Sequence, residues 1–419
     1  MMTQSNLTFT ENHEIPEGYK KTEVGFIPEN WNVVPLMHIS EKIMVGIASS
    51  ATHAYRNKGI PLLRNQNIKS NKLDDDDIIY ISEEYEKGFF NKRLKEGDLL
   101  TARTGYPGTT CLVPKIFENA QSFTTLITRL KSDSENPIYL SYFINSEKGQ
   151  KFFTDNQIGG GQKNVNAATL KRFPVIVPPL NEQQKIATVL SDTDALISEL
   201  EKLIEKKQAI KTATMQQLLT GKTRLPEFAL REDGTPKGYK DSELGQIPED
   251  WDISNLGTYT TYIGSGKTNT RNFGEFPLYG STGIIGSCSK AEYTGNAILV
   301  ARVGANAGKL NAVNGLYGVS DNTIIVRLNN DTDLDFIKYM LIRKNLNKLV
   351  FGSGQPLITG TQLRELSVLM PVPEEQIAIA NILKNIDIEI DIFKSKLNKL
   401  NQIKQGMMQE LLTGKTRLV

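Results

Sequence analysis

Two long stretches of the chain place apolar residues at helical spacing. In residues 372–419 one row recurs every seven residues and a second row lies between its members, interrupted by Lys404. Two interleaved rows seven residues apart are typical of helices that pack as a coiled coil. The predicted rows are Ile186, Leu190, Ile197, Leu200, Ile204 and Leu218 in residues 179–220, and Ile379, Leu383, Ile386, Ile390, Phe393, Leu397, Leu400, Met407 and Leu411 in residues 372–419.

Neither stretch contains an internal proline, so each can form one helix, and about 40 residues at about 1.5 Å per residue give a rod of roughly 60 Å. A lone helix with such a stripe would leave it exposed to water. We therefore predict an antiparallel coiled coil of the two helices. The alternative is that each helix packs on its own domain.

The regions between these helices show a mixed pattern. Short apolar runs such as "DIIYISEEY" and "AILVARVG" predict strands, whereas "YLSYFINS" and "LDFIKYMLIRKN" predict helices, and glycine-containing turns separate them. Residues 32–178 and 252–371 are therefore predicted to be two α/β domains of mixed α+β type.

The chain is internally repeated, which indicates how these parts are ordered. "PEGYKKTEVGFIPENW" at Pro16–Trp31 matches "PKGYKDSELGQIPEDW" at Pro236–Trp251, and Gln183–Leu225 matches Gln376–Leu418. The predicted segments are an N-terminal segment 1–31, a first mixed domain 32–178, a central helix 179–220, a connector 221–251 that repeats the N-terminal segment, a second mixed domain 252–371 and a C-terminal helix 372–419.

A weaker likeness continues inside the mixed domains. Arg103, at the end of "LLTAR", parallels Arg302 in "LVAR", and Gln162 before Leu170 parallels Gln355 before Leu363. The two domains are therefore predicted to share one fold. Joined end to end, Leu418 would lead into Pro16 much as Leu225 leads to Pro236, so we expect the two chain ends to approach one another.

Composition narrows the class of protein only slightly. The 49 Lys and Arg against 47 Asp and Glu predict no strongly basic surface, so any basic region must be local. Two cysteines and three histidines without an HxH or HExxH pair predict no disulfide framework and no metal site. The polar start and the absence of a long apolar run predict a cytoplasmic protein.

The sequence "LLTGKTRL" occurs twice and suggests a phosphate-binding loop. That loop requires G-x-x-x-x-G-K-[ST] before a helix, because its amides and the helix N-terminus hold the phosphates. Gln216 and Gln409 stand where the first glycine should be, and both copies follow a helix. We interpret Gly221 and Gly414 as left-handed helix stops.

Other motifs also favour structural roles over catalysis. "NPIY" at Asn136–Tyr139 resembles the adenine-binding motif of amino-methyltransferases, but Ile138 replaces its second proline, and a helix start fits better. The acidic run Asp74–Asp77 is interpreted as a solvated turn. With no nucleophile arrangement recognised either, the chain is predicted to be non-catalytic.

The order of motifs resembles the specificity subunit of type I restriction-modification systems. The resemblance rests on "GYKKTEVGFIPENWNVVPL", "PPLNEQQKIATVL" and "QQLLTGKTRLP", followed by "GYKDSELGQIPEDWDISNLG", "PEEQIAIANIL" and "QELLTGKTRL", and it spans nearly the whole chain. It implies that the two mixed domains are target recognition domains, each reading one half of an interrupted double-stranded DNA sequence, with the paired helices setting the spacer.

The resemblance also implies partners. The helices and repeated segments would dock two modification subunits, which bind S-adenosylmethionine and methylate adenine, and a restriction subunit would join them for ATP-driven translocation and Mg-dependent cleavage. This chain itself would bind no cofactor and no membrane. The rival hypothesis is a coiled-coil scaffold whose repeated domains bind protein or carbohydrate.

Polar side chains on predicted loops are the candidate DNA contacts, because Arg, Lys, Asn, Gln, Ser and Thr read base edges and Lys and Arg hold phosphates. The candidates in the first domain are Arg64, Asn65, Gln66, Asn67, Lys69, Arg103, Thr104, Tyr106, Gln162, Lys163 and Asn164. Those in the second domain are Lys267, Thr268, Asn269, Arg271, Tyr279, Ser281, Thr282, Arg302 and Gln355.

Overall fold

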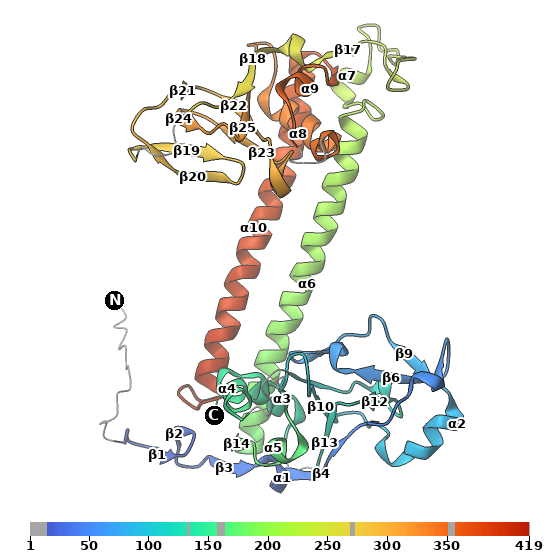
Figure 1. Cartoon of the computed structure of the whole chain (residues 1–419), viewed down its shortest axis with the longest axis vertical. Coiled ribbons are helices and arrows are strands. Elements are labelled where there is room, and N and C mark those ends of the chain that lie inside the picture. Colours follow the sequence, from blue (N-terminus) through green and yellow to red (C-terminus); the bar gives the residue numbers. More distant parts are fainter. Residues whose placement is uncertain (1–14, 132–134, 157–163, 269–272, 351–356, 419) are drawn as a thin grey trace. The chain divides into compact units, whose positions relative to one another are not determined.

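The structure, a computed structural model, describes residues 15–131, 135–156, 164–268, 273–350 and 357–418. The chain divides into two compact units, one formed by Met1–Leu200 with Leu397–Val419 and the other by Glu201–Lys396. Both units have mixed α/β content, as predicted (Figure 1).

The first unit contains two four-stranded sheets. One has the order β11 (Thr110–Leu112), β10 (Leu99–Thr101), β13 (Leu126–Leu130), β4 (Ser40–Val45), and the other β12 (Gln121–Phe123), β6 (Ile60–Arg64), β9 (Ile79–Ile81), β5 (Tyr55–Arg56). The smaller pairs are β1 (Tyr19–Thr22) with β2 (Gly25–Pro28), β3 (Asn32–Pro35) with β14 (Pro174–Val177), and β7 (Ile68–Lys69) with β8 (Lys72–Leu73). Its short helices are α1 (Leu36–Ile39), α2 (Glu83–Glu86), α3 (Pro137–Asn145), α4 (Glu147–Asp155) and α5 (Ala167–Lys171), with 3-10 turns η1 (Thr52–Ala54), η2 (Asn65–Asn67), η3 (Lys87–Lys92) and η4 (Lys115–Phe117).

The second unit also contains two four-stranded sheets, and the strand order of its first sheet matches that of the first unit. Its sheets have the orders β18 (Thr260–Ser265), β25 (Thr323–Leu328), β22 (Ala297–Ala301), β23 (Leu310–Val313) and β20 (Gly283–Cys288), β19 (Phe276–Gly280), β24 (Leu316–Val319), β21 (Tyr293–Thr294). The pairs are β15 (Tyr239–Lys240) with β16 (Ile247–Pro248) and β17 (Asp252–Asn255) with β26 (Ser367–Met370). Its short helices are α7 (Pro226–Ala229), α8 (Leu334–Lys344) and α9 (Gly360–Arg364), with 3-10 turns η5 (Leu256–Tyr259), η6 (Gly304–Asn306) and η7 (Leu346–Leu349).

The shared topology extends to unusual details. Each domain has one parallel pair, β12 with β6 and β24 with β19, within otherwise antiparallel sheets. In each domain a glycine, Gly46 or Gly266, lies so close to a neighbouring strand that an added Cβ would meet its backbone at 2.3 Å. The prediction that the two domains share one fold is confirmed.

Local sequence explains where the short helices begin. Asn136 caps α3 by accepting a hydrogen bond from the backbone N–H of Tyr139 at 3.0 Å, and Pro137 occupies the first turn. "NPIY" is therefore a helix start, as predicted. Asp333 caps α8 in the same way, accepting from the N–H of Phe336 at 2.7 Å.

The long helices α6 (Leu180–Leu218) and α10 (Pro373–Leu411) contain 39 residues each. Within the first unit Lys404 of α10 forms an ion pair with Asp194 of α6 at 2.5 Å. Within the second unit Lys211 pairs with Asp387 at 2.6 Å and Lys207 with Glu389 at 2.5 Å. Residue numbers rise along one helix as they fall along the other, so the helices are antiparallel, as predicted.

The residues of the predicted rows are all buried or half-buried. Near the helix ends, however, these residues pack against a domain core as well as lying on the helix row. Ile186 and Leu190 belong to the core of the first domain, and Ile379 and Leu383 belong to the core of the second. The alternative of packing on the domains thus applies to the ends of the helices.

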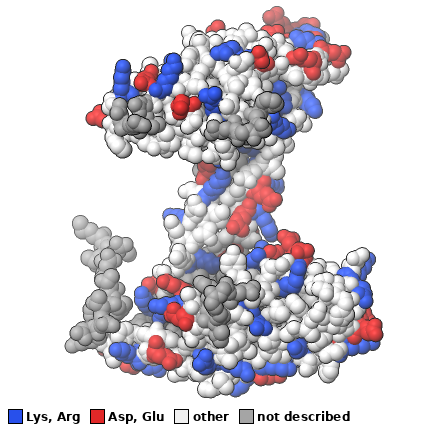
Figure 2. Space-filling model, in the orientation of Figure 1, with Lys and Arg blue, Asp and Glu red and all other residues white. Residues whose placement is uncertain are grey.

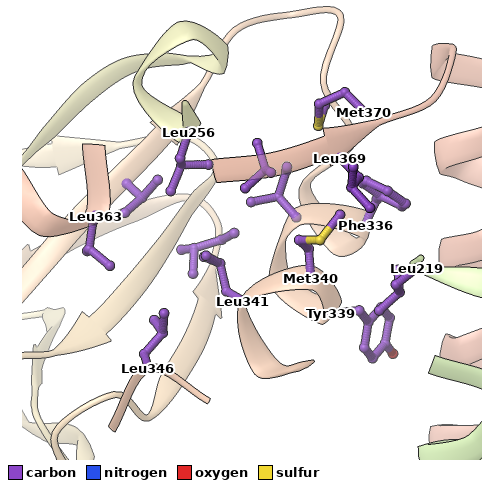
Figure 3. Packing of buried hydrophobic residues seen from close by; sticks show 14 of the residues in the cluster. Leu219, Leu256, Phe336, Tyr339, Met340, Leu341, Leu346, Leu363, Leu369 and Met370 are labelled. Carbon is purple, nitrogen blue, oxygen red and sulfur yellow. The ribbon is translucent and has the colours of Figure 1, made fainter. Parts of the chain in front are cut away.

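The core of the second domain lies between α8, β26 and the sheet of β18, β25, β22 and β23. Figure 3 shows Phe336, Met340 and Leu341 of α8 near Leu369, with Leu219 beside Tyr339. These apolar residues recur on α8 at helical spacing and are buried together. Their burial fixes α8 against the sheet, and so fixes the loops at the ends of its strands.

Each long helix is followed by a glycine in the left-handed conformation, three residues after its last residue, as predicted. Gly221 has φ +69° and Gly414 has φ +72°, a conformation that favours glycine. A Cβ at Gly221 would lie 2.4 Å from Pro248, and one at Gly414 would lie 2.5 Å from Pro28. Each glycine therefore lets the chain turn tightly against a "GxIPE" segment.

Each long helix is followed by one junction with a repeated "GxIPE" segment, and each junction lies in one unit. We call the junction between the end of α10 and the N-terminal segment the open junction, and the junction between the end of α6 and the connector the continuous junction. In the open junction, Arg417 donates to both oxygens of Glu182 at 2.7 and 2.8 Å, and the indole of Trp31 donates to Glu182 at 3.1 Å. In the continuous junction, Arg224 donates to Glu375 at 2.7 and 2.8 Å, and Trp251 donates to Glu375 at 3.1 Å.

The open junction brings the two ends of the chain together. The hydroxyl of Tyr19 donates to the carbonyl of Gly414 at 2.8 Å, and the backbone N–H of Leu418 donates to Glu182 at 3.4 Å. The expected approach of the chain ends is confirmed within the first unit, for the part of the ends that the structure describes.

Candidate nucleic-acid interface

The polar segment after β6 forms a tight turn, and not all of its side chains face outward. Asn67 is buried, its Oδ1 accepting from the N–H of Arg64 at 2.9 Å and its Nδ2 donating to the carbonyls of Asp74 and Asp76 at 3.1 Å each. Because its hydrogen-bonding groups are used internally, Asn67 shapes the turn and is removed from the candidate contacts.

Arg64 and Gln66 converge on one carboxylate. Arg64 donates to Asp77 Oδ2 at 2.9 Å and Gln66 donates to the same oxygen at 3.0 Å. Asp77 is exposed and has φ +55°. The acidic run is therefore an exposed turn that holds two candidate side chains in place. The carboxylates of Asp74, Asp75 and Asp76 also lie within 4.8 Å of one another, a spacing at which acidic groups could hold a metal ion, but exposed acidic groups are common without one.

Asn65 joins this turn to the loop after β10. Its Oδ1 accepts from the N–H of Arg103 at 2.8 Å, and its Nδ2 donates to Thr124 at 3.2 Å. Sequence reasoning did not find Thr124, which follows β12 and is adjacent only because β12 and β6 are parallel. Two segments proposed separately, 64–67 and 103–106, thus form one surface.

Within the loop after β10, Tyr106 is the most exposed candidate, with 82% of its surface accessible, whereas Thr104 is half-buried. The carbonyl of Arg103 accepts from the N–H of Val165 at 3.1 Å, which brings Asn164 to the same surface. The Nε of Arg103 and the Oδ1 of Asn164 are buried and have no hydrogen-bond partner among the described residues. These two polar groups lie beneath this surface without an internal partner in the described part of the chain.

The remaining first-domain candidates are less informative. Lys69 is exposed on the β7–β8 hairpin and pairs with Asp74 at 3.6 Å. Gln162 and Lys163 lie outside the described residues.

The second domain places Arg302 as the first places Arg103. Its carbonyl accepts from the N–H of Ile358 at 2.9 Å, and its guanidinium donates to Ser265 at 3.3 Å. Its Nε is also buried without a partner in the described part of the chain. The parallel drawn from sequence between Arg103 and Arg302 thus corresponds to equivalent positions in the fold.

The other second-domain candidates divide by exposure. Thr268 is buried, donating to Glu292 at 2.8 Å and accepting from the N–H of Val319 at 2.9 Å, so it is removed from the candidates. Lys267 is exposed beside it. Ser281 and Thr282 form the turn between β19 and β20. Tyr279 is half-buried, with its ring 6.0 Å from that of Tyr317. Asn269, Arg271 and Gln355 fall outside the described residues.

The surface carries no extended region of one charge in the view of Figure 2, where basic and acidic side chains are interspersed. This agrees with the near balance of charge in the sequence. On this face a polyanionic ligand would therefore be held by a few local cations. Candidates for this role include Arg327, half-buried on β25, which sequence reasoning missed.

The family is decided by a domain match that occurs twice. The model of the type I restriction modification DNA specificity domain matches residues 28–212 and 242–402, which is more than half of the chain. The chain belongs to the type I restriction-modification DNA specificity family.

Two curated relatives match most of the chain. The chain is 29% identical to a Methanocaldococcus jannaschii protein assigned as the specificity subunit of type I restriction enzyme MjaX, covering 96% of this chain and 97% of that protein. It is 27% identical to the MjaVIII specificity subunit of the same organism, over 70% of this chain and 74% of that protein.

Solved structures confirm the fold. The S subunit of the type I restriction-modification system from M. genitalium matches with a TM-score of 0.62 at 16% identity, covering 91% of this chain and 96% of that one. A chain from a structure of type I complex assembly and conformational transition matches with a TM-score of 0.52 at 16% identity, over 93% of this chain and 99% of that one.

This specificity subunit is therefore the DNA-recognition component of a type I restriction-modification complex, and the scaffold hypothesis is not favoured. The two family matches cover both domains and most of both long helices, so the recognition function belongs to the repeated halves together. Among the described residues, no helix is long and apolar enough to cross a membrane.

Proposed function

We propose that each mixed domain of this specificity subunit reads one half of a bipartite DNA target, and that the helices α6 and α10 set the spacer between the halves. The observation that carries this proposal is the repeated placement of Arg103 and Arg302. Each follows a central strand, accepts a hydrogen bond from the segment before α5 or α9, and keeps a buried Nε without a partner among the described residues.

The retained candidates form one surface in each domain. In the first domain the bases would be contacted by Arg64, Gln66, Arg103, Thr104, Tyr106 and Asn164, with Asn65, Lys69, Gln162 and Lys163 as further candidates. In the second domain they would be contacted by Ser281, Thr282 and Arg302, with Lys267, Tyr279, Asn269, Arg271 and Gln355 as further candidates for contact with bases or phosphates. Arg offers paired donors to a base edge, and Asn and Gln each offer a donor beside an acceptor, which supports these roles.

The specificity subunit is proposed to be non-catalytic and to bind no cofactor. Two modification subunits would dock on the helices and would bind S-adenosylmethionine, and restriction subunits would use ATP and Mg. Exposed apolar residues on α6 support a docked partner, because Val189, Leu196, Leu203 and Ile210 recur every seven residues. Such a stripe faces water unless another helix covers it.

The spacer proposal is tested by lengthening the helices. Seven residues that continue the row spacing are inserted into α6 after Leu200 and into α10 after Lys396. Each insertion adds about 10 Å of helix, or about three base pairs of B-DNA. The expected result is the same two half-sites with a changed preferred spacer, measured by methylome sequencing of cells that express the variant with its modification subunits.

The control inserts the same seven residues after Glu232, in the exposed connector between Leu230 and Pro236. This variant should methylate the original target, because neither helix is lengthened. An unchanged spacer in the helix variant would overturn the proposal that the helices set it. Altered half-site sequences would instead overturn the assignment of recognition to the domains alone.

A further inference from the structure

Arg129 and Arg327 occupy the same position in the two recognition domains. Arg129 lies opposite Lys42 across the β13–β4 pair, and Arg327 lies opposite Tyr262 across the β25–β18 pair. Each arginine is the penultimate residue of its strand. The two side chains therefore start from equivalent backbone positions, and their surroundings can be compared directly.

In the first domain Arg129 is neutralised. Its Nε donates to Asp98 Oδ1 at 2.9 Å and its Nη2 donates to Asp98 Oδ2 at 2.7 Å. The side chain of Asp98 is only 2% exposed, and the same Nη2 also donates to the carbonyl of Arg93. This bidentate pair uses Arg129 within the fold and leaves it unavailable to a ligand.

In the second domain the carboxylate is missing. Leu99 lies opposite Thr128 and Ile298 opposite Val326, so the residue equivalent to Asp98 is Ala297. Arg327 donates through Nη2 to the carbonyl of Thr294 at 3.0 Å, and its buried Nε has no hydrogen-bond partner among the described residues. No ion pair within 4.0 Å links Arg327 to a carboxylate in the described ranges.

Arg327 lines a cleft of about 440 Å³ together with Tyr262, Lys267, Glu292 and Tyr293. Its guanidinium lies 5.8 Å from the centre of the Tyr293 ring, which limits its movement. The Glu292 carboxylate is the counter-charge in the cleft, and its Oε2 accepts from the buried Thr268. Two cations against one carboxylate leave the cleft positively charged.

We propose that this cleft binds a phosphate group, with Arg327 and Lys267 as its cationic contacts and the hydroxyl of Tyr262 as an additional donor. The proposal rests on the proposed function, since the phosphate would belong to the DNA backbone beside the second half-site. A phosphate is favoured over a base because guanidinium and ammonium groups only donate hydrogen bonds and carry positive charge, which matches the acceptor-only, negatively charged phosphate, whereas adenine and cytosine edges also present donors. In this proposal the first domain makes no equivalent phosphate contact, because the guanidinium of Arg129 is already paired with Asp98.

The test measures DNA binding by the full chain carrying Arg327→Gln or Lys267→Gln. Each lost phosphate contact should lower the dependence of log K on log salt by about 0.9, which weakens binding about eightfold at about 0.1 M salt. The loss should be equal for target and unrelated DNA, because a phosphate carries no sequence information. Thermal unfolding of each variant verifies that the second unit remains folded.

A matched variant, Ala297→Asp, places the missing carboxylate where the first domain has it. It should reproduce the weakened binding of Arg327→Gln while leaving every cleft residue in place. Arg327→Lys, which keeps the charge, should retain most of the salt dependence. An unchanged salt dependence in folded Arg327→Gln would overturn the proposal, as would a loss confined to one DNA sequence, which indicates base contact.

A second arm separates a DNA phosphate from a free one. The ³¹P signal of inorganic phosphate is measured with the wild-type chain and with Arg327→Gln. In one outcome the wild type broadens the phosphate signal and Arg327→Gln does not, but neither variant changes DNA binding. That outcome supports the phosphate site but overturns its assignment to DNA. If neither chain binds DNA or broadens the phosphate signal, the proposed function and the site both fail. Broadening with no DNA binding sinks the proposed function alone.

Discussion

The open and continuous junctions use the same three side chains under different chain connectivity. In the continuous junction Arg224 lies 26 residues before Asp250 and is linked to Trp251 through the connector. In the open junction Arg417 reaches Glu182 across 235 residues of sequence. The same arginine–glutamate–tryptophan contacts therefore occur both where the connector joins the partners along the chain and where the partners are far apart in sequence.

The continuous junction also has additional charges. Arg224 donates to Asp250 at 2.7 and 3.1 Å, and Lys237 donates to Asp250 at 2.8 Å. In the open junction the equivalent residues are Asn30 and Glu17, neither of which can reproduce that pair. Burial raises the pKa of Asp250, but the hydrogen bonds from Arg224 and Lys237 outweigh it and lower that pKa to about 2.

The open junction compensates through its buried carboxylate. Burial alone would raise the pKa of Glu182, but hydrogen bonds from Arg417 and Trp31 outweigh this effect and lower it. Both junctions therefore share a buried glutamate and an arginine over a tryptophan, and only the continuous junction adds the carboxylate of Asp250.

The largest effect is expected from Arg224→Met. It leaves Glu375, whose side chain is 1% exposed, without its cation, and removes the main partner of Asp250. The free energy of unfolding should fall by about 3–5 kcal/mol, measured by urea titration. Arg231→Met is the control, because its pair with Glu249 is largely exposed and should contribute less than about 1 kcal/mol. Equal losses in the two variants would contradict the buried-pair argument.

Arg417→Met should have a smaller effect of about 2 kcal/mol, because the last residues can detach locally and let water reach Glu182. Hydrogen exchange should rise at Tyr19–Trp31 and along residues 411–418, while the second unit keeps its protection. A loss as large as that of Arg224→Met, or exchange that rises equally in both units, would show that connectivity makes no difference.

The charge of Asp250 should make the continuous junction sensitive to acid. Its native pKa of about 2 lies below the ordinary value of 3.8, so its contribution is present above about pH 4 and is lost as the pH falls toward 2. The contribution is at most about 2 kcal/mol. Wild type and Asp250→Asn should differ in unfolding free energy at pH 7 and converge near pH 2. A constant difference across this range would contradict the assignment.

The smallest effect is expected from Asn30→Asp, which places a carboxylate in the open junction where the continuous one has Asp250. Asn30 is exposed, so any new pair with Arg417 should stabilise by less than about 1 kcal/mol and weaken with salt. Urea titration at low and high salt measures it. A salt-independent gain would mean that the two junctions differ by something other than this charge.

The helices, the repeat and the helix-stop glycines could be predicted because each is a periodic or duplicated feature of the sequence. The burial of Glu182 and Glu375 could not, because a glutamate at the start of a helix resembles any exposed one until Arg417 or Arg224 is placed beside it. The interaction joins residues that no local pattern connects.

The candidate surfaces show the same limit. The likeness of Arg103 and Arg302 was visible in sequence, whereas Asn67 and Thr268 read as loop contacts although both are buried. A polar side chain that shapes a turn and one that faces a ligand have the same sequence signature. Arg327 was missed because "TIIVRL" reads as an ordinary strand, and its lost carboxylate at Ala297 becomes visible only when the two sheets are aligned.

The sequence contains two tryptophans, Trp31 and Trp251, and each lies fully buried in one junction beneath an arginine. Intrinsic fluorescence is therefore a separate optical signal for each unit. With Trp31→Phe the emission comes from the continuous junction alone, and with Trp251→Phe from the open one. A red shift on loss of either arginine would then report which end of the molecule admits water, without any added label.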